Sequence, residues 1–400
     1  MIKKIFVEGA RHLFLILFIP FCLITLLEII IRLSGVETEV VKSKEFNIQV
    51  PIWTFNDLNY SAAEDIYGRI IKNTVPAESA EWMKCFEEAK YLQYKMKPNV
   101  RAFVFNTVNQ MEILKGKKVL FKSNSDGFRT KEISRKKEKG VFRIICLGDS
   151  ATFGWGVNQE ETFSKFLEDK LNSNSAQRRF EVLNLAIPGY TSYHGKAVFE
   201  HFALKYSPDM LILSFGGNDG RPIPKKAKKI LERGRKFQGI NYFLLNLKTY
   251  RFMRRLLYAR HNPFKKIQEK KGANLDMEAF VTPKEYQENL GSIIKTARER
   301  GIETLLLALC CPLDYLNAMT RISRRMNVDR INGMKVLLES IPSIIEGKLY
   351  PNLAKHYREL YGIENIEKRK MLYVTSDTCH PNVLGHKILA DTLYDYMIKK

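Results

Sequence analysis

From Val141 onward the chain alternates short apolar runs with longer amphipathic stretches, and this alternation limits the possible folds more than any other sequence feature. Buried parallel strands are short and almost continuously apolar, whereas the helices that cover them mix apolar and polar residues. Strand-like runs occur at residues 142–148, 180–186, 210–215, 303–310 and 371–374. Helical stretches separate them at residues 162–171, 192–206, 283–300 and 383–398. We therefore predict an α/β fold with a doubly wound, five-stranded parallel sheet. Because long segments at 221–280 and 312–370 interrupt the pattern, we also predict helical inserts.

The amino-terminal segment has the length and composition of a membrane span. Residues 13–31 are apolar except for Glu28, and a helix of these 19 residues is about 28 Å long, close to the roughly 30 Å of a bilayer's hydrocarbon core. No small-residue cleavage site follows, so we predict an uncleaved transmembrane signal anchor at residues 12–33. A buried core helix is the alternative. Basic residues flank both ends of the span, and their count slightly favours a cytoplasmic location for residues 1–11.

Composition and charge narrow the classes of partner. With 45% hydrophobic and 11% aromatic residues the chain is long enough to bury a core, which excludes disorder as its main state. The formal net charge is +22, and residues 221–271 hold 17 of the 65 Lys and Arg but only 2 of the 43 Asp and Glu. Apolar residues recur near helical spacing in this basic insert, which is typical of a helix on anionic lipid or an acidic polymer. A solvated helix packed on the sheet is the alternative, and nucleic acid is disfavoured because no recognition fold accompanies the charge.

The six cysteines do not have the placement of a disulfide framework. Cys22, Cys146 and Cys310 lie in apolar runs, so we expect them to be small buried hydrophobic residues. The sequence contains no CxxC pair and no HExxH motif. We therefore predict no structural zinc site.

Polar residues and glycines that suit acyl transfer follow four of the strand-like runs. Ser150 follows the first run, Gly189 the second and Asn218 the third, and Asp377 and His380 follow the fifth. In open α/β sheets the reactive groups collect at the carboxyl ends of the strands. A serine between a strand and a helix lies beside amides that hold an oxyanion, and a glycine lets the backbone approach a ligand. The sequence therefore predicts a nucleophile, an acid and base, and oxyanion donors at one sheet edge.

These loops resemble the sequence blocks of the SGNH, or GDSL-type, hydrolase superfamily. The blocks are matched, in this chain order, by residues 148–150 (GDS), Gly189, residues 216–219 (GGND) and residues 377–380 (DTCH). Residues 124–129 (NSDGFR), together with the amino-terminal span, also resemble a bacterial membrane-anchored branch. The resemblance implies a flavodoxin-like SGNH hydrolase fold and a reaction that uses no metal and no cofactor.

The same resemblance implies a role for each site residue. Ser150 would be the nucleophile, His380 the general base and then the general acid, and Asp377 the group that fixes the tautomer of the imidazole. The backbone N–H groups of Ser150 and Gly189 and the side chain of Asn218 would form the oxyanion hole.

The leading hypothesis is a membrane-anchored serine esterase or O-deacylase that forms an acyl-enzyme on Ser150. We expect residues 34–140 to be a lead-in segment with short strands and residues 141–400 to be the SGNH hydrolase domain. The catalytic domain is predicted to be periplasmic or extracellular and to act on acylated envelope glycan or lipid. Two alternatives stay open: an O-acyltransferase that uses the same acyl-enzyme, and a catalytically silent envelope scaffold that binds glycan.

Overall fold

The structure is a computed structural model in which the chain forms two compact units. Unit 1 comprises Met1–Glu64 and Leu231–Ala273, and unit 2 comprises Asp65–Ile230 and Asn274–Lys400. The residues that the structure describes are 2–42, 49–51, 77–105, 118–175, 178–225, 228–229, 232, 238–260, 276–361, 371–374 and 378–399.

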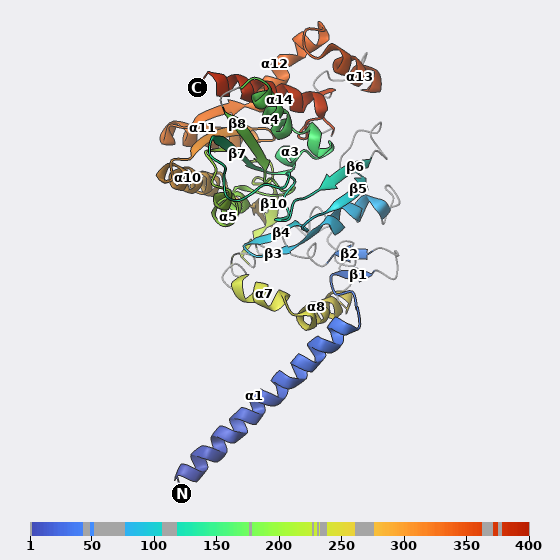
Figure 1. The fold of residues 1–400 in the computed structure, drawn as a ribbon, viewed down its shortest axis with the longest axis vertical. Coiled ribbons are helices and arrows are strands. Elements are labelled where there is room, and N and C mark those ends of the chain that lie inside the picture. The colour runs from blue at the N-terminus through green and yellow to red at the C-terminus, as the bar shows by residue number, and fades with distance from the viewer. Residues whose placement is uncertain are drawn as a thin grey trace. The chain divides into compact units, whose positions relative to one another are not determined.

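Unit 2 is built on a five-stranded parallel sheet, as predicted. Its strands are β7 (Val141–Gly148), β8 (Arg179–Asn184), β9 (Met210–Ser214), β12 (Glu303–Ala308) and β13 (Asp329–Asn332). They lie in the order β13-β12-β9-β7-β8, and every pair of neighbours is parallel (Figure 1). Numbered along the chain, this is the order 2-1-3-4-5 read from the β8 edge, which is the flavodoxin-like order. The switch point between β7 and β9 is therefore where a ligand is expected to bind.

Four of the five predicted strands are confirmed, and the fifth prediction is wrong. The apolar run at residues 371–374 forms no strand of the sheet, and β13, with the polar sequence DRIN, takes the edge position beside β12. An edge strand has only one neighbour and need not be apolar. The run 371–374 is buried, but its backbone bonds elsewhere: Val374 N–H donates to the carbonyl of His380, and Asn382 N–H donates to that of Leu372.

Helices cover both faces of the sheet, and the four predicted helical stretches are confirmed (Figure 1). One face carries α4 (Phe163–Ser173), α12 (Gly333–Ile345) and α14 (Val383–Ile398), with α13 (Pro351–Tyr361) beside α12. The other face carries α5 (Ser192–His201), α10 (Pro283–Glu299) and α11 (Leu313–Met326). Short helical turns complete the unit: η2 (Ala77–Cys85), α3 (Ser150–Phe153), η4 (Gln159–Glu161) and η5 (Ala203–Tyr206).

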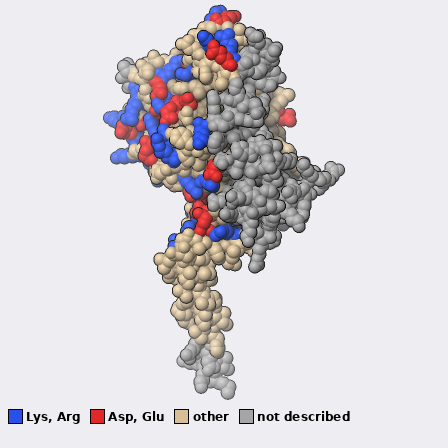
Figure 2. Space-filling view, turned by 90° about the vertical axis from the view of Figure 1, so that its right-hand side faces the viewer, with Lys and Arg blue, Asp and Glu red and all other residues tan. Residues whose placement is uncertain are grey.

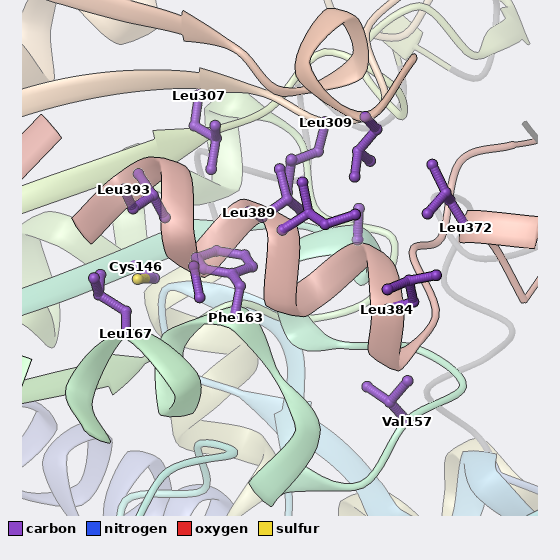
Figure 3. Close-up of a cluster of buried hydrophobic side chains, with 14 of the residues drawn as sticks. Cys146, Val157, Phe163, Leu167, Leu307, Leu309, Leu372, Leu384, Leu389 and Leu393 are labelled. Carbon is purple, nitrogen blue, oxygen red and sulfur yellow. The ribbon is translucent and has the colours of Figure 1, made fainter. Parts of the chain in front are cut away.

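The main core lies between the sheet and helices α4, α12 and α14 (Figure 3). Because successive side chains of a strand point to opposite faces, Ile144 and Cys146 of β7 belong to this core. Phe163 of α4 and Leu389 of α14 meet them there, and both are fully buried. This packing fixes β7, and with it the loop that follows its carboxyl end.

Among the described residues of unit 2, four antiparallel strands precede the sheet in the chain. β3 (Phe86–Ala89) pairs with β4 (Leu92–Met96), and β5 (Arg101–Phe105) pairs with β6 (Lys118–Lys122). The lead-in segment at 34–140 thus contains short strands. β10 (Pro222–Pro224) pairs with β11 (Met277–Ala279), so the two segments where the chain leaves and re-enters unit 2 lie side by side.

Unit 1 contains a long helix and part of the basic insert. The helix α1 (Ile2–Leu33) includes Phe14–Leu33, which is long and apolar enough to cross a membrane, and only 6% of that window is buried. The core helix of a soluble protein, in contrast, is mostly buried. The unit also holds β1 (Val40–Lys42), β2 (Gln49–Pro51), α7 (Gln238–Leu245) and α8 (Lys248–Arg260).

A buried ion pair in the sheet gives a test of the fold. Arg143 of β7 and Glu181 of β8 are each at most 5% exposed, and their side chains meet at 2.7 Å. Arg143→Ala would leave a buried carboxylate without its main partner, so we expect the free energy of unfolding to fall by about 3 kcal/mol or more. In the Arg143→Met/Glu181→Leu double variant no charge is left unpaired, so most of this loss should be recovered. Urea denaturation of the full chain in detergent measures both, and a double variant no more stable than Arg143→Ala would contradict the assignment.

Candidate active site

Ser150 stands where β7 ends and α3 begins. Asp149 caps this helix, because its Oδ1 accepts a hydrogen bond from the Ala151 N–H at 3.0 Å. A Cβ on Gly148 would lie 2.2 Å from Oγ1 of Thr152, so only glycine fits immediately before the turn. Ser150 is half-buried, and its hydroxyl therefore stays within reach of solvent.

The structure brings Ser150 and His380 together, although 230 residues separate them in the chain. The distance between Ser150 Oγ and His380 Nε2 is 2.7 Å. That is within the 2.6–3.2 Å expected between a hydroxyl nucleophile and the base that removes its proton. The third predicted residue, Asp377, lies outside the described residues.

The loop that carries Gly189 is held by two buried tyrosines. Tyr94 of β4 donates its hydroxyl to the carbonyl of Pro188, and Tyr190 donates its hydroxyl to the carbonyl of Tyr94. Gly189 has a positive φ of 81°, a conformation that glycine adopts without strain. Among the described residues, no group accepts a hydrogen bond from the N–H of Gly189 or Ser150.

Asn218 lies beside the serine loop. Its Nδ2 donates to the carbonyl of Tyr190 at 3.2 Å and to Oδ2 of Asp149 at 3.4 Å. The carboxamide is therefore fixed between the loops after β7 and β8. The predicted oxyanion donors Ser150, Gly189 and Asn218 thus come from the three loops that follow the neighbouring strands β7, β8 and β9.

Two buried carboxyl groups organise these loops. Asp219 accepts hydrogen bonds from the Ser192 N–H at 2.9 Å, from the Ser192 hydroxyl at 2.6 Å and from the Gly216 N–H at 3.1 Å. Burial raises the pKa of Asp219 to about 7 and that of Asp149 to about 6, although hydrogen bonds from N–H groups oppose the rise. The role of Asp219 is to join the loop after β9 to the start of α5.

Arg129 is a positioning residue that the sequence analysis did not single out by itself. It ends the NSDGFR segment at 124–129 and is 1% exposed. Its guanidinium donates to the carbonyls of Gly154 and Val157 at 2.7 Å each and to that of Phe153 at 3.0 Å. These carbonyls follow the serine turn, so Arg129 fixes the carboxyl end of α3. The matched motif could have pointed to this residue, but not to its partners.

A disulfide joins Cys310 and Cys379, with 4.9 Å between their Cα atoms. The expectation that Cys310 is only a buried hydrophobic residue was therefore wrong. The reason is local: β12 ends at Ala308, so Cys310 lies in the loop at the carboxyl edge, where it meets the loop before His380. Cys146 is buried as expected, whereas Cys22 is exposed on α1.

His386, on α14, is buried and differs from His380 in its surroundings. Its Nδ1 accepts a hydrogen bond from the Phe163 N–H at 3.1 Å, and its ring stacks on Phe163. Burial lowers the pKa of His386 to about 3, so this imidazole is neutral. It supports the core, and among the described residues it does not contact Ser150.

The sheet order agrees with the SGNH hydrolase fold that the sequence predicts. Residues 146–334 match the model of the GDSL-like Lipase/Acylhydrolase family. This part of the chain is similar to GDSL-type lipases and acylhydrolases, and the match indicates an ester-bond hydrolase. The family match favours an enzyme over the silent scaffold.

The solved structures that are similar to the chain include esterases and lipases. One is the psychrotrophic esterase EstA from Pseudoalteromonas sp., at 18% identity over 64% of this chain and 97% of that chain, with a TM-score of 0.37. Another is the lipase/acylhydrolase from Enterococcus faecalis, at 13% identity over 64% and 95% of the two chains, with a TM-score of 0.36. A search of the curated proteins found no match.

The buried carboxyl group of Asp219 predicts a pH-dependent stability. Its pKa is about 7 in the folded chain and near 3.8 when the group is exposed, so the folded state binds the proton more tightly. The contribution of Asp219 to stability therefore falls as the pH rises from about 4 to 7. With Asn218 and Asp149 unchanged, the Asp219→Asn substitution should lower the free energy of unfolding by about 2 kcal/mol less at pH 8 than at pH 5. Urea denaturation of both proteins at the two pH values measures this difference, and an equal cost would contradict a raised pKa.

Proposed function

We propose that the chain hydrolyses carboxylic esters through an acyl-enzyme on Ser150. The hydrogen bond between Ser150 Oγ and His380 Nε2 is the observation that carries this proposal. His380 removes the hydroxyl proton while Oγ attacks the carbonyl carbon of the ester. The same imidazole then gives the proton to the departing alcohol. A water molecule then attacks the acyl-enzyme with the same help from His380, and the acid is released. Asp377 holds the imidazole in the required tautomer.

In the proposed mechanism the oxyanion is bound by donors from three loops. The N–H groups of Ser150 and Gly189 have no protein acceptor among the described residues, so both can donate to an oxygen atom of a ligand. Asn218 is held by the Tyr190 carbonyl, whereas its 3.4 Å contact with Asp149 is long for a hydrogen bond. An oxyanion would replace this weaker contact as negative charge develops.

We also propose that α1 is retained as a membrane anchor and that unit 2 lies outside the cytoplasm. Two observations support this location. Glu28 and Arg32, in the last turns of α1, hydrogen-bond to the segment 246–249 of the basic insert, so the helix is part of the folded unit 1. The Cys310–Cys379 disulfide fits an oxidising compartment such as the periplasm or the cell exterior. For a domain in that location we propose acylated envelope glycans or lipids as the substrate class.

The roles of the site residues predict distinct losses of activity. Ser150→Ala removes the nucleophile and should lower kcat for an acetyl ester by at least about 10⁴-fold. Asn218→Ala removes one oxyanion donor and should lower kcat by about 10²–10³-fold. Asp377→Asn should cost about 10⁴-fold, because the wrong tautomer of His380 is then favoured.

Hydrolysis of a chromogenic acetyl ester by the full chain in detergent measures all three variants. Ser340→Ala, a half-buried serine of α12, is the matched control and should keep the parent rate. A Ser150→Ala protein that turns over the ester at the parent rate would overturn the assignment.

A further inference from the structure

The carboxyl end of α1 is joined to the basic insert by a buried carboxylate. The Glu28 side chain is 13% exposed and accepts hydrogen bonds from the Lys248 N–H at 2.9 Å and from the Thr249 N–H and hydroxyl at 2.8 Å each. Arg32 Nε donates to the same side chain at 2.7 Å. Glu28 therefore caps the amino terminus of α8, where the helix dipole favours a negative charge. These contacts explain how an acidic residue is tolerated within an apolar span.

This cap places α7 and α8 at the boundary of the bilayer, given the proposed anchor. Glu28 precedes the end of the span, Leu33, by five residues, which is about 7.5 Å along a helix. Amphipathic helices that lie on a membrane bury their apolar faces by about 5–10 Å. Figure 2 shows the described part of α1 as an uncharged column with charged atoms gathered at its upper end. That arrangement is typical of a helix that leaves a membrane there.

The consecutive helices α7 and α8 expose large apolar side chains. On α7 these are Ile240 and Phe243, at 62% and 68% exposure, and on α8 they are Met253, Leu256 and Leu257, at 49%, 44% and 54%. The spacing of the α8 residues puts them on one face of the helix. Such an apolar face beside a membrane span is stabilised by lipid rather than by water.

Two arginines of α8 are engaged within unit 1. Arg251 forms an ion pair with Glu39 at 2.6 Å, and Arg255 donates to the carbonyl of Glu37. Both therefore hold the segment that follows α1. We propose that helices α7 and α8 lie in the interfacial layer of the membrane, with their exposed apolar side chains among the lipid acyl chains. The lipid surface next to the anchor is what these apolar side chains contact, and this proposal rests on the proposed anchoring.

Tryptophan quenching by bromine-labelled lipid tests the location. The full chain is reconstituted at a low protein-to-lipid ratio in phosphatidylcholine vesicles with brominated acyl chains, and each added tryptophan is compared with the parent's emission. Phe243→Trp and Leu257→Trp should lose at least half of the added emission. Leu338→Trp, on α12 of unit 2, replaces a leucine that is also 54% exposed and should be quenched little. Leu23→Trp, within the span, reports the anchor itself.

The outcomes separate the two proposals. If Leu23→Trp is quenched but Leu257→Trp is quenched no more than Leu338→Trp, the proposal for α7 and α8 is wrong and the anchor stands. If Leu23→Trp is not quenched, the anchor fails and the proposal for α7 and α8 fails with it. Protection of Phe243→Trp that appears only at high protein density would show that a second copy of the chain covers the face, which also overturns the proposal.

The disulfide carries a second, independent inference about the active site. Cys379 immediately precedes His380, and Cys310 packs against the loop that carries Asn218. A Cβ on Gly217 would stand 2.8 Å from the Cys310 carbonyl oxygen and 2.9 Å from its Sγ. The covalent bond thus joins the histidine loop to the loop after β12, which packs against the loop that carries Asn218.

We infer that the Cys310–Cys379 disulfide positions His380 toward Ser150, so that activity depends on its oxidation. The inference rests on the proposed function of these residues. Both cysteines are half-buried and within reach of a dithiol. In the reduction, two electrons and two protons pass from dithiothreitol to the two sulfur atoms, and dithiothreitol closes to its cyclic disulfide. A shift of about 1 Å in a catalytic group can cost about 10²-fold in rate.

Kinetics with and without dithiothreitol test this inference on the full chain in detergent. Reduction should lower kcat by about 10–100-fold, leave KM nearly unchanged and be reversed by re-oxidation. The Cys310→Ser/Cys379→Ser variant should have the same low kcat and no response to dithiothreitol, which excludes an effect on the buried thiols of Cys85, Cys146 and Cys311. Circular dichroism at the assay temperature shows that the variant is folded.

Two results would decide against the inference. A reduced protein that keeps the parent kcat would show that the disulfide does not position His380. A fall in kcat with loss of the folded circular dichroism signal would show that the bond only stabilises the fold. Failure of the proposed function is distinguishable, because Ser150→Ala would then keep the parent rate in the oxidised protein.

Discussion

The proposed activity depends on one hydrogen bond, between Ser150 Oγ and His380 Nε2, formed at the carboxyl edge of a parallel sheet. The sheet makes this contact possible because parallel strands deliver their following loops to a single edge. Ser150 comes directly from β7, which is a central strand. His380 comes from a loop that no strand of the sheet carries, so other interactions have to hold it. The antiparallel bridge from Tyr373 to Pro381 and the disulfide at Cys379 provide them.

Buried polar groups shape the loops around that contact, and they do so at an energetic cost. Arg129, Asp149 and Asp219 are almost fully buried. The energetic cost of burying each group is offset by its hydrogen bonds with the backbone or side chains of the site loops. Groups like these cost several kcal/mol when they lack partners. Their placement beside Ser150 and Asn218 therefore indicates that loop geometry, and not stability alone, is what they secure.

Much of the fold and part of the site could be predicted from the sequence. Four strands followed from apolar periodicity, and Ser150 and His380 followed from their places after such runs. The fifth strand was missed because burial alone does not specify pairing: the run at 371–374 is apolar but bonds to its own loop, while the polar β13 occupies an edge. The Cys310–Cys379 bond and the Glu28 cap on α8 join residues more than 60 positions apart, and no local pattern encodes such contacts.

The most direct test of the central claim is the rate at which a fluorophosphonate labels Ser150 in the parent chain and in His380→Gln, with the labelled peptide identified by mass spectrometry. The account predicts that Ser150 carries the label and that His380→Gln slows labelling by at least about 10³-fold, since the hydroxyl then lacks its base. Equal labelling rates, or a label on another serine, would contradict it.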